Sequence, residues 1–273
     1  MRPLRNVIAT SALALACAVA AAPALAAACG GNFDVWLQGF AQEAAAQGVS
    51  QRTISSALAG LSPDPRVLSL DRTQHTTFGQ SFEQFSAKRV TAYSVQKGQS
   101  LMKRYAPVFN RIEQQYGVPG PVLVAIWGLE SGFGTFTGNL STIRSLATLA
   151  HDCRRSEKFT EELVAALKII DRGDLSPAEM HGAWAGELGQ TQFLPSSYLK
   201  FAVDYDGNGK RDLIRSAPDV LASTANYLKG YGWRKGQPWG EGSANFQVLL
   251  EWNKSEVYSK TVAYFATRLA GGQ

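Results

Sequence analysis

The chain of 273 residues carries 45% hydrophobic, 10% aromatic and 18% charged side chains, a composition that excludes a disordered chain. Its 26 glycines and 11 prolines follow no repeating period, which excludes collagen-like and low-complexity sequences. The net charge of +5 is too small to indicate nucleic acid as a partner, and it is compatible with an anionic polymer as substrate.

Residues 1–26 have the pattern of a secretory signal peptide. Two arginines precede an apolar run from Val7 to Ala22, and a small-x-small cleavage pattern ends at Ala26. A retained membrane anchor is the alternative, but the run is short and rich in alanine, so we predict export to the periplasm without stable membrane insertion. Lipid anchoring through Cys29 is not favoured, because Ala26 stands where a lipoprotein signal usually has Leu.

Two cysteines remain after removal of the signal peptide, Cys29 and Cys153. An even pair in an exported chain predicts a disulfide bond. The alternative is two inert buried thiols, since a free cysteine behaves as a small hydrophobic residue.

Hydrophobic spacing predicts helices through most of the mature chain. Apolar residues between Phe33 and Ala44 recur every three or four positions, which places them on one helical face. Further helices are expected over residues 53–61, over 82–116 with an interruption near Gly98, from Pro121 onward, and over 140–150, 156–171, 196–203 and 219–230. Ser156 and Asp219 are the expected N-caps of two of them, and residues 246–252 alternate in a way that suggests a strand. The pattern predicts a mostly α single catalytic domain.

The most informative segment runs from Pro121 to Gly134. It is apolar on every face and carries one carboxylate, Glu130, at the C-terminal end of the predicted helix. Apolar surroundings and the negative end of the helix dipole both disfavour an ionised carboxylate there. A glutamic acid that stays protonated near neutral pH is suited to act as general acid in glycosidic cleavage, whereas a structural Glu–Arg pair is the alternative.

A second segment, Gly182 to Tyr198, combines small residues with Gln190 and Gln192. Small residues let the backbone approach a ligand closely, and carboxamides suit sugar hydroxyl or acetamido groups. A tight turn that leads into the helix after Pro195 is the alternative.

A third segment resembles the start of an EF-hand-type calcium loop. Its candidate ligands follow the spacing of such a loop and are Asp204, Asp206, Asn208, Lys210 and Asp212. Arg215 occupies the position of the usual bidentate glutamate, and Asp219 is the residue that could close the site instead. The prediction is a possible structural Ca²⁺, against a solvated turn rich in aspartate and asparagine.

Several common chemistries are excluded. The three histidines lack the spacing of zinc ligands, and the sequence contains neither a Gly-x-Ser-x-Gly elbow nor a phosphate-binding loop.

Taken together, the motifs resemble the lytic murein transglycosylases of the B type, a branch of the lysozyme-like superfamily. The resemblance rests on the Ala-Ile-Trp-Gly-Leu-Glu-Ser segment, the Gly-Gln-x-Gln-Phe-Leu-Pro-Ser-Ser-Tyr run, the Asp-rich loop, and Ala-Asn226-Tyr227 followed by Gly232-Trp233. It implies a lysozyme-like α+β catalytic domain over residues 27–273. A helical N-terminal part would span about 30–118 and a catalytic core about 119–260.

The resemblance implies cleavage of the β-1,4 bond between N-acetylmuramic acid and N-acetylglucosamine in peptidoglycan glycan strands. Glu130 would protonate the leaving oxygen and then accept the proton of the muramoyl C6 hydroxyl, which closes onto C1 and gives a 1,6-anhydro end. No second carboxylate and no required cofactor are implied, whereas ordinary glycosidases use a carboxylate pair.

The resemblance also implies a set of residues that bind substrate. Those that match positions lining the glycan groove of the family are Gln192, Arg154, Arg155, Tyr227 and Asn253, with Asn226, Ser131 and Tyr258 as further candidates. The two arginines have an alternative role in pairing with acids. Ala183 and Glu187 depart from the family pattern, and Glu187 offers a possible second carboxylate.

The sequence is compatible with two alternative functions. A hydrolytic muramidase would cleave the same bond with water as acceptor, since residue types alone do not show whether water is excluded. A non-catalytic peptidoglycan-binding protein would tolerate loss of the Glu130 carboxyl, and the intact Glu130 disfavours it.

Overall fold

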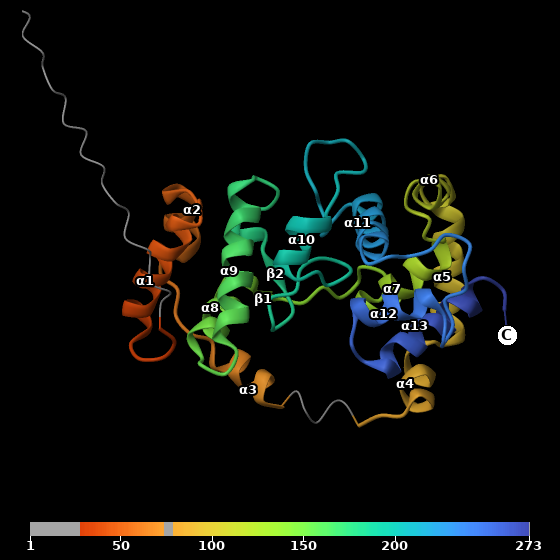
Figure 1. The fold of residues 1–273 in the computed structure, drawn as a ribbon, viewed down its shortest axis with the longest axis horizontal. Helices are drawn as coiled ribbons and strands as arrows, with labels where there is room; N and C mark the ends of the chain where they lie inside the picture. The colour runs from red at the N-terminus through yellow and green to blue at the C-terminus, as the bar shows by residue number, and fades with distance from the viewer. Residues whose placement is uncertain (1–27, 74–78, 273) are drawn as a thin grey trace, which may run out of the picture.

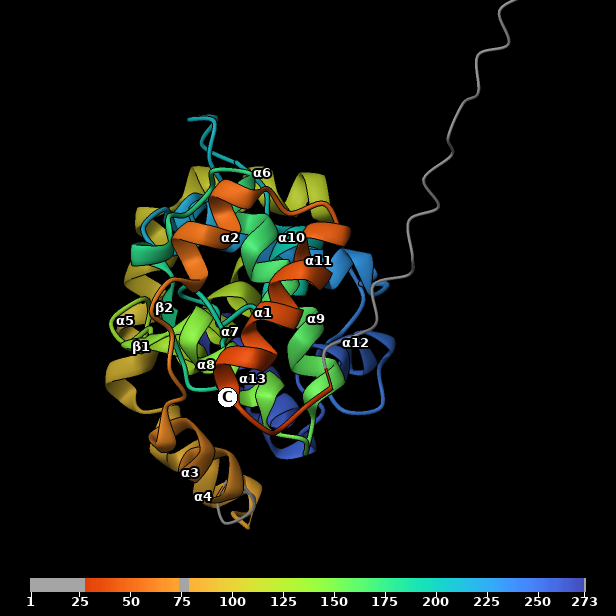
Figure 2. The same cartoon turned by 90° about the vertical axis from the view of Figure 1, so that its left-hand side faces the viewer.

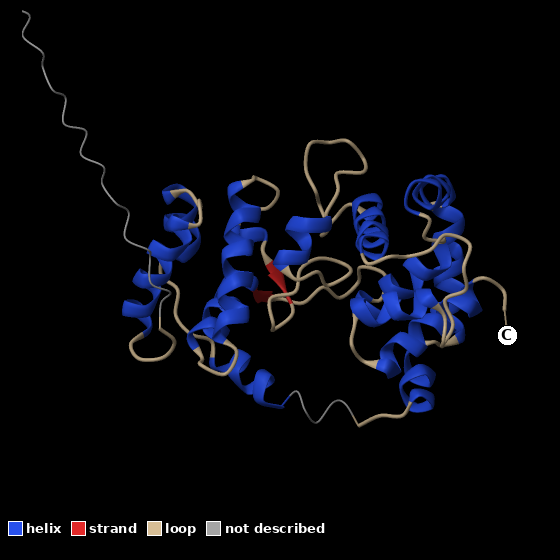
Figure 3. Cartoon of the chain, viewed as in Figure 1, coloured by secondary structure: helices blue, strands red, loops and turns tan. Residues whose placement is uncertain are grey.

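The computed structural model describes residues 28–73 and 79–272, so the predicted signal peptide lies outside the described residues. Helices make up most of this part of the chain (Figure 3). The N-terminal helices are α1 (Phe33–Ala46), α2 (Gln51–Leu58), α3 (Pro65–Thr73), α4 (Phe82–Arg89), α5 (Ala92–Arg104) and α6 (Ala106–Tyr116). The remaining elements are α7 (Gly120–Ser131), β1 (Leu140–Ser141), α8 (Thr142–His151), α9 (Ser156–Asp171), the 3₁₀ turn η2 (Pro177–Glu179), β2 (His181–Gly182), α10 (Pro195–Phe201), α11 (Ala217–Gly230), α12 (Ala244–Trp252) and α13 (Glu256–Leu269).

Helix α7 forms the centre of one half of the molecule. Its sequence is apolar on all sides, and nearly every residue from Val122 to Leu129 is buried. It packs against α5, α6, α11 and α13. The approach of α13 is close, because a Cβ atom at Gly128 would lie 2.8 Å from the ring of Phe265. Burial of an all-apolar helix on every side contributes hydrophobic stabilisation to this half of the molecule.

The helices fall into two groups that are visible in Figure 1. Helices α1 and α2 pack on α8 and α9 respectively, and α3 packs on α8 (Figures 1 and 2). Helices α4, α5 and α6 pack instead on α7 or α13. The helical N-terminal part therefore contributes to both groups.

A short antiparallel ladder lies between the groups and shapes the loop that follows it. Leu140 pairs with Gly182 and Ser141 with His181. A Cβ atom at Gly182 would lie 1.7 Å from the carbonyl oxygen of Glu187, so only glycine allows the chain to fold back this tightly. The turn from Gly182 to Phe193 is compact for this reason.

The predicted disulfide is confirmed: Cys29 and Cys153 are bonded, with their Cα atoms 5.2 Å apart. The bond joins the segment before α1 to the turn after α8. The amide of Gly30 also donates to the carbonyl of His151 at 2.8 Å, so the N-terminal segment is held at two neighbouring points.

Four local predictions are wrong. Residues 246–252 do not form the predicted strand but belong to helix α12. The hydroxyl of its N-cap Ser243 accepts a hydrogen bond from Phe246 N, and the helix buries Phe246 and Leu249 on one face. Helix α5 continues through Gly98, because the missing side chain makes room for Val124 and Leu269 rather than breaking the helix. The breaks in this tract fall at Val90 and Tyr105 instead.

The two remaining errors concern helix caps. Ser156 donates its hydroxyl to the carbonyl of Ala150 and does not cap α9. Ser216 caps α11 by accepting from Asp219 N, while the carboxylate of Asp219 accepts hydrogen bonds from the preceding loop. The helix at residues 156–171 itself has the predicted bounds.

Among the described residues, no helix has both the length and the apolar character that a membrane crossing requires.

Replacement of both Cys29 and Cys153 by Ser is expected to lower the free energy of unfolding by about 2–5 kcal/mol, because the bond closes a long loop in the unfolded chain. Denaturant unfolding of the variant and of the parent, each with and without dithiothreitol, measures this. The double variant should not respond to the reductant. Equal stability of the oxidised parent and the variant would contradict the expected role of the bond.

Candidate active site

Glu130 is the penultimate residue of α7, where the helix emerges from the core. Its neighbours Leu129 and Ser131 are buried, while the Glu130 side chain is half-buried and borders a pocket. The left-handed residue Gly132 ends the helix directly after it. The sequence of an apolar helix therefore places one carboxyl group at the boundary between core and pocket.

Two side chains from the C-terminal helices hold this carboxyl group. The Tyr258 hydroxyl donates to Glu130 Oε1 at 2.6 Å, and Trp252 Nε1 donates to the same oxygen at 3.0 Å. Since both donors use Oε1, a proton on the neutral carboxyl resides on Oε2. Burial raises the pKa of Tyr258 well above its usual value, so its phenol remains a hydrogen-bond donor.

Burial raises the pKa of the Glu130 carboxyl above its ordinary value. The hydrogen bonds from Tyr258 and Trp252 favour the ionised form and oppose this rise. The charge of Glu187 raises the pKa further, and the charge of Arg89 lowers it. Burial is the largest of these effects, so the site favours a protonated Glu130 to a higher pH than an exposed glutamate allows.

The pocket next to Glu130 has a volume of about 320 Å³. Its wall contains residues from the Gly182–Phe193 turn, α10, α11 and the end of α12; these include Ala183, Glu187, Gln192, Phe193, Ser197, Tyr227, Trp252 and Asn253. No Lys, Arg or His is among the lining residues. The pocket offers carboxyl, carboxamide, hydroxyl and aromatic groups, which are suited to a neutral polar ligand.

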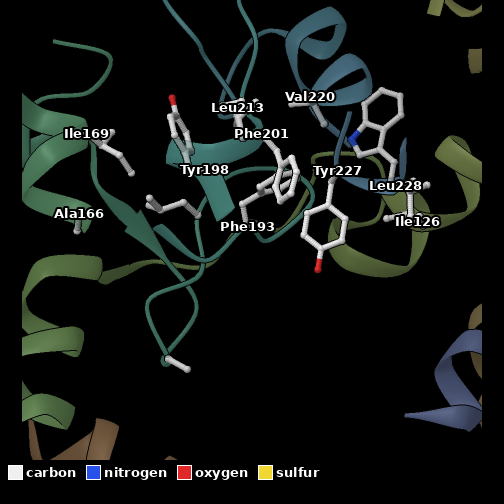
Figure 4. Close-up of a cluster of buried hydrophobic side chains, with 14 of the residues drawn as sticks. Ile126, Ala166, Ile169, Phe193, Tyr198, Phe201, Leu213, Val220, Tyr227 and Leu228 are labelled. Atoms are coloured by element: carbon white, nitrogen blue, oxygen red, sulfur yellow. The ribbon is translucent and has the colours of Figure 1, made fainter. Parts of the chain in front are cut away.

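Aromatic contacts fix the side chain that reaches Glu130 from α12. The ring of Trp252 packs edge to face against the ring of Tyr227, with centroids 4.8 Å apart. It packs in the same way against the ring of Phe193, with centroids 5.3 Å apart. Phe193 and Tyr227 also meet at 5.9 Å, and they lie side by side in Figure 4. The Tyr227 hydroxyl donates to the carbonyl of Glu251 at 2.9 Å. This cluster aims the indole N–H at the carboxyl group.

Gln192 lines the pocket from a strained backbone position. Its φ of 52° is unusual for a residue other than glycine. Its Nε2 donates to the carbonyl of Gly189 at 2.7 Å and to that of Thr137 at 3.1 Å. The carboxamide oxygen is not used in either bond, and strain of this kind is typical of ligand sites.

Ser131 and Gln190 lie deeper and connect α7 to the turn. The Ser131 hydroxyl donates to the carbonyl of Gln190 and accepts from Gly134 N at 2.8 Å. The Gln190 side chain accepts from Trp127 Nε1 and donates to the carbonyl of Ile214, each at 2.8 Å. Both groups of the carboxamide are thus occupied within the protein, and the substrate-binding role of these two residues stays a prediction.

The arginine pair is held by a buried acid. Arg154 Nε donates to Asp71 Oδ2 at 2.7 Å, and Arg155 forms an ion pair with the same carboxylate. Asp71 is only 1% exposed, so its charge requires these partners. Neither arginine lines the pocket beside Glu130, and their binding role stays a prediction. Asn226 likewise lies outside this pocket and donates to the carbonyl of Phe201 at 3.0 Å.

Glu187 is the second carboxyl group of the pocket. Burial raises its pKa, and its Oε2 atom is buried without a hydrogen-bond partner among the described residues. Ala183 lines the same pocket without offering a hydroxyl. The structure therefore places both departures from the family pattern at the pocket wall.

The Asp-rich loop brings Asp204, Asp206 and Asp219 together, with one carboxylate oxygen of each within 4.8 Å of the others. Asp219 is fully buried and accepts from the amides of Tyr205 and Asp212, at 2.8 and 2.9 Å. Arg215 forms an ion pair with Glu179, and its Nε lies 3.4 Å from Asp212 Oδ2 in a second ion pair.

The other predicted ligands occupy the turn itself. Asp212 accepts from the amides of Ile214 and Arg215, and the Asn208 carboxamide accepts from Lys210 N at 2.9 Å. Carboxylate, carboxamide and backbone oxygens are the ligands that Ca²⁺ prefers, so the donor set fits this ion.

Sequence reasoning missed the contact of Trp252 with Glu130. The two residues are 122 positions apart, and the alternation over residues 246–252 predicts a strand where Trp252 in fact ends helix α12. In the sequence, the contact is indicated only by the position of Trp252 next to Asn253, a candidate for substrate binding. That is a weak signal, because most aromatic residues belong to the core.

Comparison with known proteins identifies the family. The transglycosylase SLT domain model matches residues 32–243, and the chain belongs to this family. The membrane-bound lytic murein transglycosylase B of Escherichia coli (strain K12) is 37% identical over 153 residues, 56% of this chain and 42% of that protein. The matched segment thus spans less than half the length of this relative.

Solved structures show the same lysozyme-like fold. SltB3 from Pseudomonas aeruginosa, in complex with NAG-NAM-pentapeptide, matches with a TM-score of 0.84 and 34% identity over 89% of this chain and 81% of that chain. The Escherichia coli lytic transglycosylase Slt35, in complex with calcium, matches with a TM-score of 0.78 and 27% identity over 89% of this chain and 95% of that chain. The mostly α, lysozyme-like fold predicted from the motifs is confirmed.

The environment of Glu130 predicts opposite pKa changes in two variants. Glu187→Gln removes a negative charge and is expected to lower the pKa of Glu130, whereas Tyr258→Phe removes a donor to the ionised form and is expected to raise it. Carboxyl ¹³C NMR titration of glutamate-labelled protein measures both. Glu161→Gln, on the exposed side of α9, is the matched control and should leave the titration unchanged. Shifts of the same sign in both variants would contradict this account.

Proposed function

We propose that this protein is a lytic transglycosylase that cleaves the β-1,4 bond between N-acetylmuramic acid and N-acetylglucosamine in peptidoglycan and leaves 1,6-anhydromuramoyl ends. The observation that carries the proposal is the half-buried Glu130, held by Tyr258 and Trp252 at the edge of a pocket. Membership of the transglycosylase SLT domain family supports it. The complex of SltB3 with NAG-NAM-pentapeptide supports peptidoglycan glycan strands as the ligand.

Glu130 acts first as general acid. With Oε1 engaged by two donors, the proton on Oε2 is the one available to the leaving glycosidic oxygen. Burial raises the pKa of the Glu130 carboxyl and so favours the protonated form that a general acid needs. The resulting carboxylate then accepts the proton of the C6 hydroxyl, and the two donors on Oε1 stabilise the negative charge at that moment.

The pocket binds the sugar beside the scissile bond. Gln192, Tyr227 and Asn253 line it together with Glu130, in agreement with their proposed role in substrate binding. Tyr258 acts by orienting Glu130, while Ser131 and Gln190 support the loop that carries Gln192. Arg154 and Arg155 lie outside this pocket and pair with Asp71, and the guanidinium of Arg155 lies 6.0 Å from the ring centre of Trp184, the neighbour of Ala183 in the pocket wall.

A hydrolytic muramidase is the second candidate, and Glu187 is the observation that favours it. Its carboxyl group lines the same pocket, as a second carboxylate that activates water requires. Loss of Glu187 would then abolish hydrolysis, whereas a transglycosylase needs only Glu130.

The proposed setting is the periplasm, where the substrate is found. The signal-peptide pattern and the disulfide between Cys29 and Cys153 support export. The weak net charge supports a partner other than nucleic acid.

Mass spectrometry of products from purified peptidoglycan tests the reaction. The enzyme is expected to release muropeptides that lack one water and have no reducing end, and Glu130→Gln is expected to lose at least about a hundredfold in rate, as loss of a general acid does. Glu187→Gln should retain anhydro products. Reducing muropeptides would establish the muramidase, and products from Glu130→Gln at the parent rate would contradict a catalytic role of Glu130.

We also propose a structural calcium ion in the Asp-rich loop. Asp204, Asp206, Asn208, Asp212, Asp219 and the Lys210 carbonyl would hold it. The Slt35 structure in complex with calcium supports this proposal. The ion would neutralise the clustered carboxylates and rigidify the segment between α10 and α11.

Calcium is expected to raise the melting temperature, since a ligand that binds only the folded state stabilises it by about 2.7 kcal/mol at a hundred times its Kd. Thermal unfolding in EGTA and in millimolar CaCl₂ measures the effect. Asp204→Asn should weaken the response, and MgCl₂ is the control for ionic strength. Identical melting temperatures of the parent protein in EGTA and CaCl₂ would contradict a calcium site.

A further inference from the structure

Glu187 is the carboxyl group of the pocket beside Glu130 that the proposed transglycosylase reaction does not use. Its Oε2 atom is buried without a hydrogen-bond partner among the described residues. None of the ion pairs found among residues 28–73 and 79–272 includes it. Glu130, by contrast, receives hydrogen bonds from Tyr258 and Trp252. Since buried polar groups are normally paired, a ligand in the pocket is the remaining source of a partner for Glu187.

The backbone around Glu187 is fixed by short-range contacts. Its carbonyl accepts a hydrogen bond from Ala183 N at 3.2 Å, and the next residue, Leu188, donates its N–H to the carbonyl of Phe193 at 2.7 Å. The preceding residue, Gly186, packs so closely on α8 that an added Cβ atom would clash with Leu146. The turn therefore holds the Glu187 carboxyl at the wall of the pocket.

Positive charge lies on the other side of Glu130. A second pocket that Glu130 borders, of about 400 Å³, is lined by Lys88, Arg89 and Lys97 from α4 and α5. None of these cations lines the pocket of Glu187, which has no basic side chain among its lining residues. The pocket of Glu187 is thus complementary to a cationic group rather than to an anionic one.

The pKa of Glu187 reflects the missing counter-ion. Burial raises it, and the backbone amides of Ala185 and of Glu187 itself oppose this rise. The charge of Lys158 on α9 lowers the pKa, and the charge of Glu162 on the same helix raises it. A cation supplied by a ligand would offset the cost of burying the ionised carboxyl group, because a buried charge is stabilised by pairing.

The polymer carries nitrogen close to the bond that Glu130 acts on. The sugar that is cleaved at C1 bears its nitrogen on the adjacent carbon, C2, so this substituent lies near the walls of the pocket when Glu130 reaches the glycosidic oxygen. An acetamido group offers one neutral N–H to a carboxylate. A de-N-acetylated amino group offers an ammonium, which adds positive charge and further donors.

We propose that Glu187 pairs with the ammonium group of a de-N-acetylated amino sugar, so that the protein favours partly de-N-acetylated glycan over fully acetylated glycan. This inference rests on the proposed function for the identity of the polymer. The same carboxylate accepts the N–H of an acetamido group, so acetylated glycan remains a ligand. An amino group of a stem peptide offers similar chemistry, and the test distinguishes the two sources.

Binding is measured by isothermal titration calorimetry in the Glu130→Gln background, so that no turnover occurs. Stem-free glycan strands are used in two forms, one chemically de-N-acetylated and one re-acetylated from the same preparation with acetic anhydride. The third ligand is acetylated glycan with intact stems. Adding Glu187→Gln is expected to lower the ratio of affinities for de-N-acetylated and re-acetylated glycan about tenfold, the size of one charge-assisted hydrogen bond.

Three results would overturn the proposal. The first is a ratio that is unchanged or raised by Glu187→Gln, and the second is the absence of binding by both stem-free glycans. The third is a loss of affinity for the stem-bearing ligand alone, which would assign the ammonium to the stem peptide. Failure of the proposed reaction appears separately, as the absence of anhydro products from the unsubstituted protein, because these affinities are measured without turnover.

Glu161→Gln is the matched control, because Glu161 is an exposed acid of α9 outside the pocket and its replacement removes the same charge. It should leave the ratio unchanged. Glu187→Asp keeps the negative charge and is expected to retain more of the ratio than Glu187→Gln. Glu187→Ala gives the same comparison if Glu187→Gln does not fold. The chain has a net positive charge, so a non-specific attraction for the ammonium ligand is not expected.

Discussion

The burial of α7 is the constraint on which the rest of the structure depends. An apolar helix of this kind must be covered on every side, and α5, α6, α11 and α13 cover it. The same packing places Glu130 where the cover ends, so its carboxyl group is partly removed from water and still reaches a pocket. The raised pKa of Glu130 is thus a direct consequence of how the central helix is buried.

The polar contacts around α7 show how the core and the site are connected. Gln190 uses both groups of its carboxamide to join Trp127 of α7 to the carbonyl of Ile214. Ser131 connects the end of the same helix to the backbone of Gln190. These buried bonds set the position of the turn that carries Gln192 and Glu187, so the far wall of the pocket is positioned by the helix that carries Glu130.

Charge is distributed unevenly about Glu130. One neighbouring pocket carries carboxyl groups and no cation among its lining residues, and the other carries three cations. Glu187 and Arg89 consequently act on the pKa of Glu130 in opposite directions. The same charges that act on the pKa of the acid also give the two pockets on either side of it opposite electrostatic character.

The sequence by itself determined the features that depend on neighbouring residues or on composition. The apolar run before Glu130 predicted a buried helix with a carboxyl group at its end, and helix α9 has the predicted bounds. Local spacing was misleading at residues 246–252, where helix α12 depends on a cap and a buried face rather than on alternation. For a similar reason, Gly98 does not break helix α5, because its missing side chain allows close packing against Val124 of α7.

Only the tertiary structure decided which distant side chains meet. Trp252 and Tyr258 reach Glu130 from 122 and 128 positions away, and Arg154 and Arg155 turn to Asp71 across more than 80 positions. Such partners are chosen by how helices pack, because a buried charge or donor takes whichever complementary group the packing brings within reach. The sequence shows which chemical groups are present, but it does not show how far apart these groups lie in the folded chain.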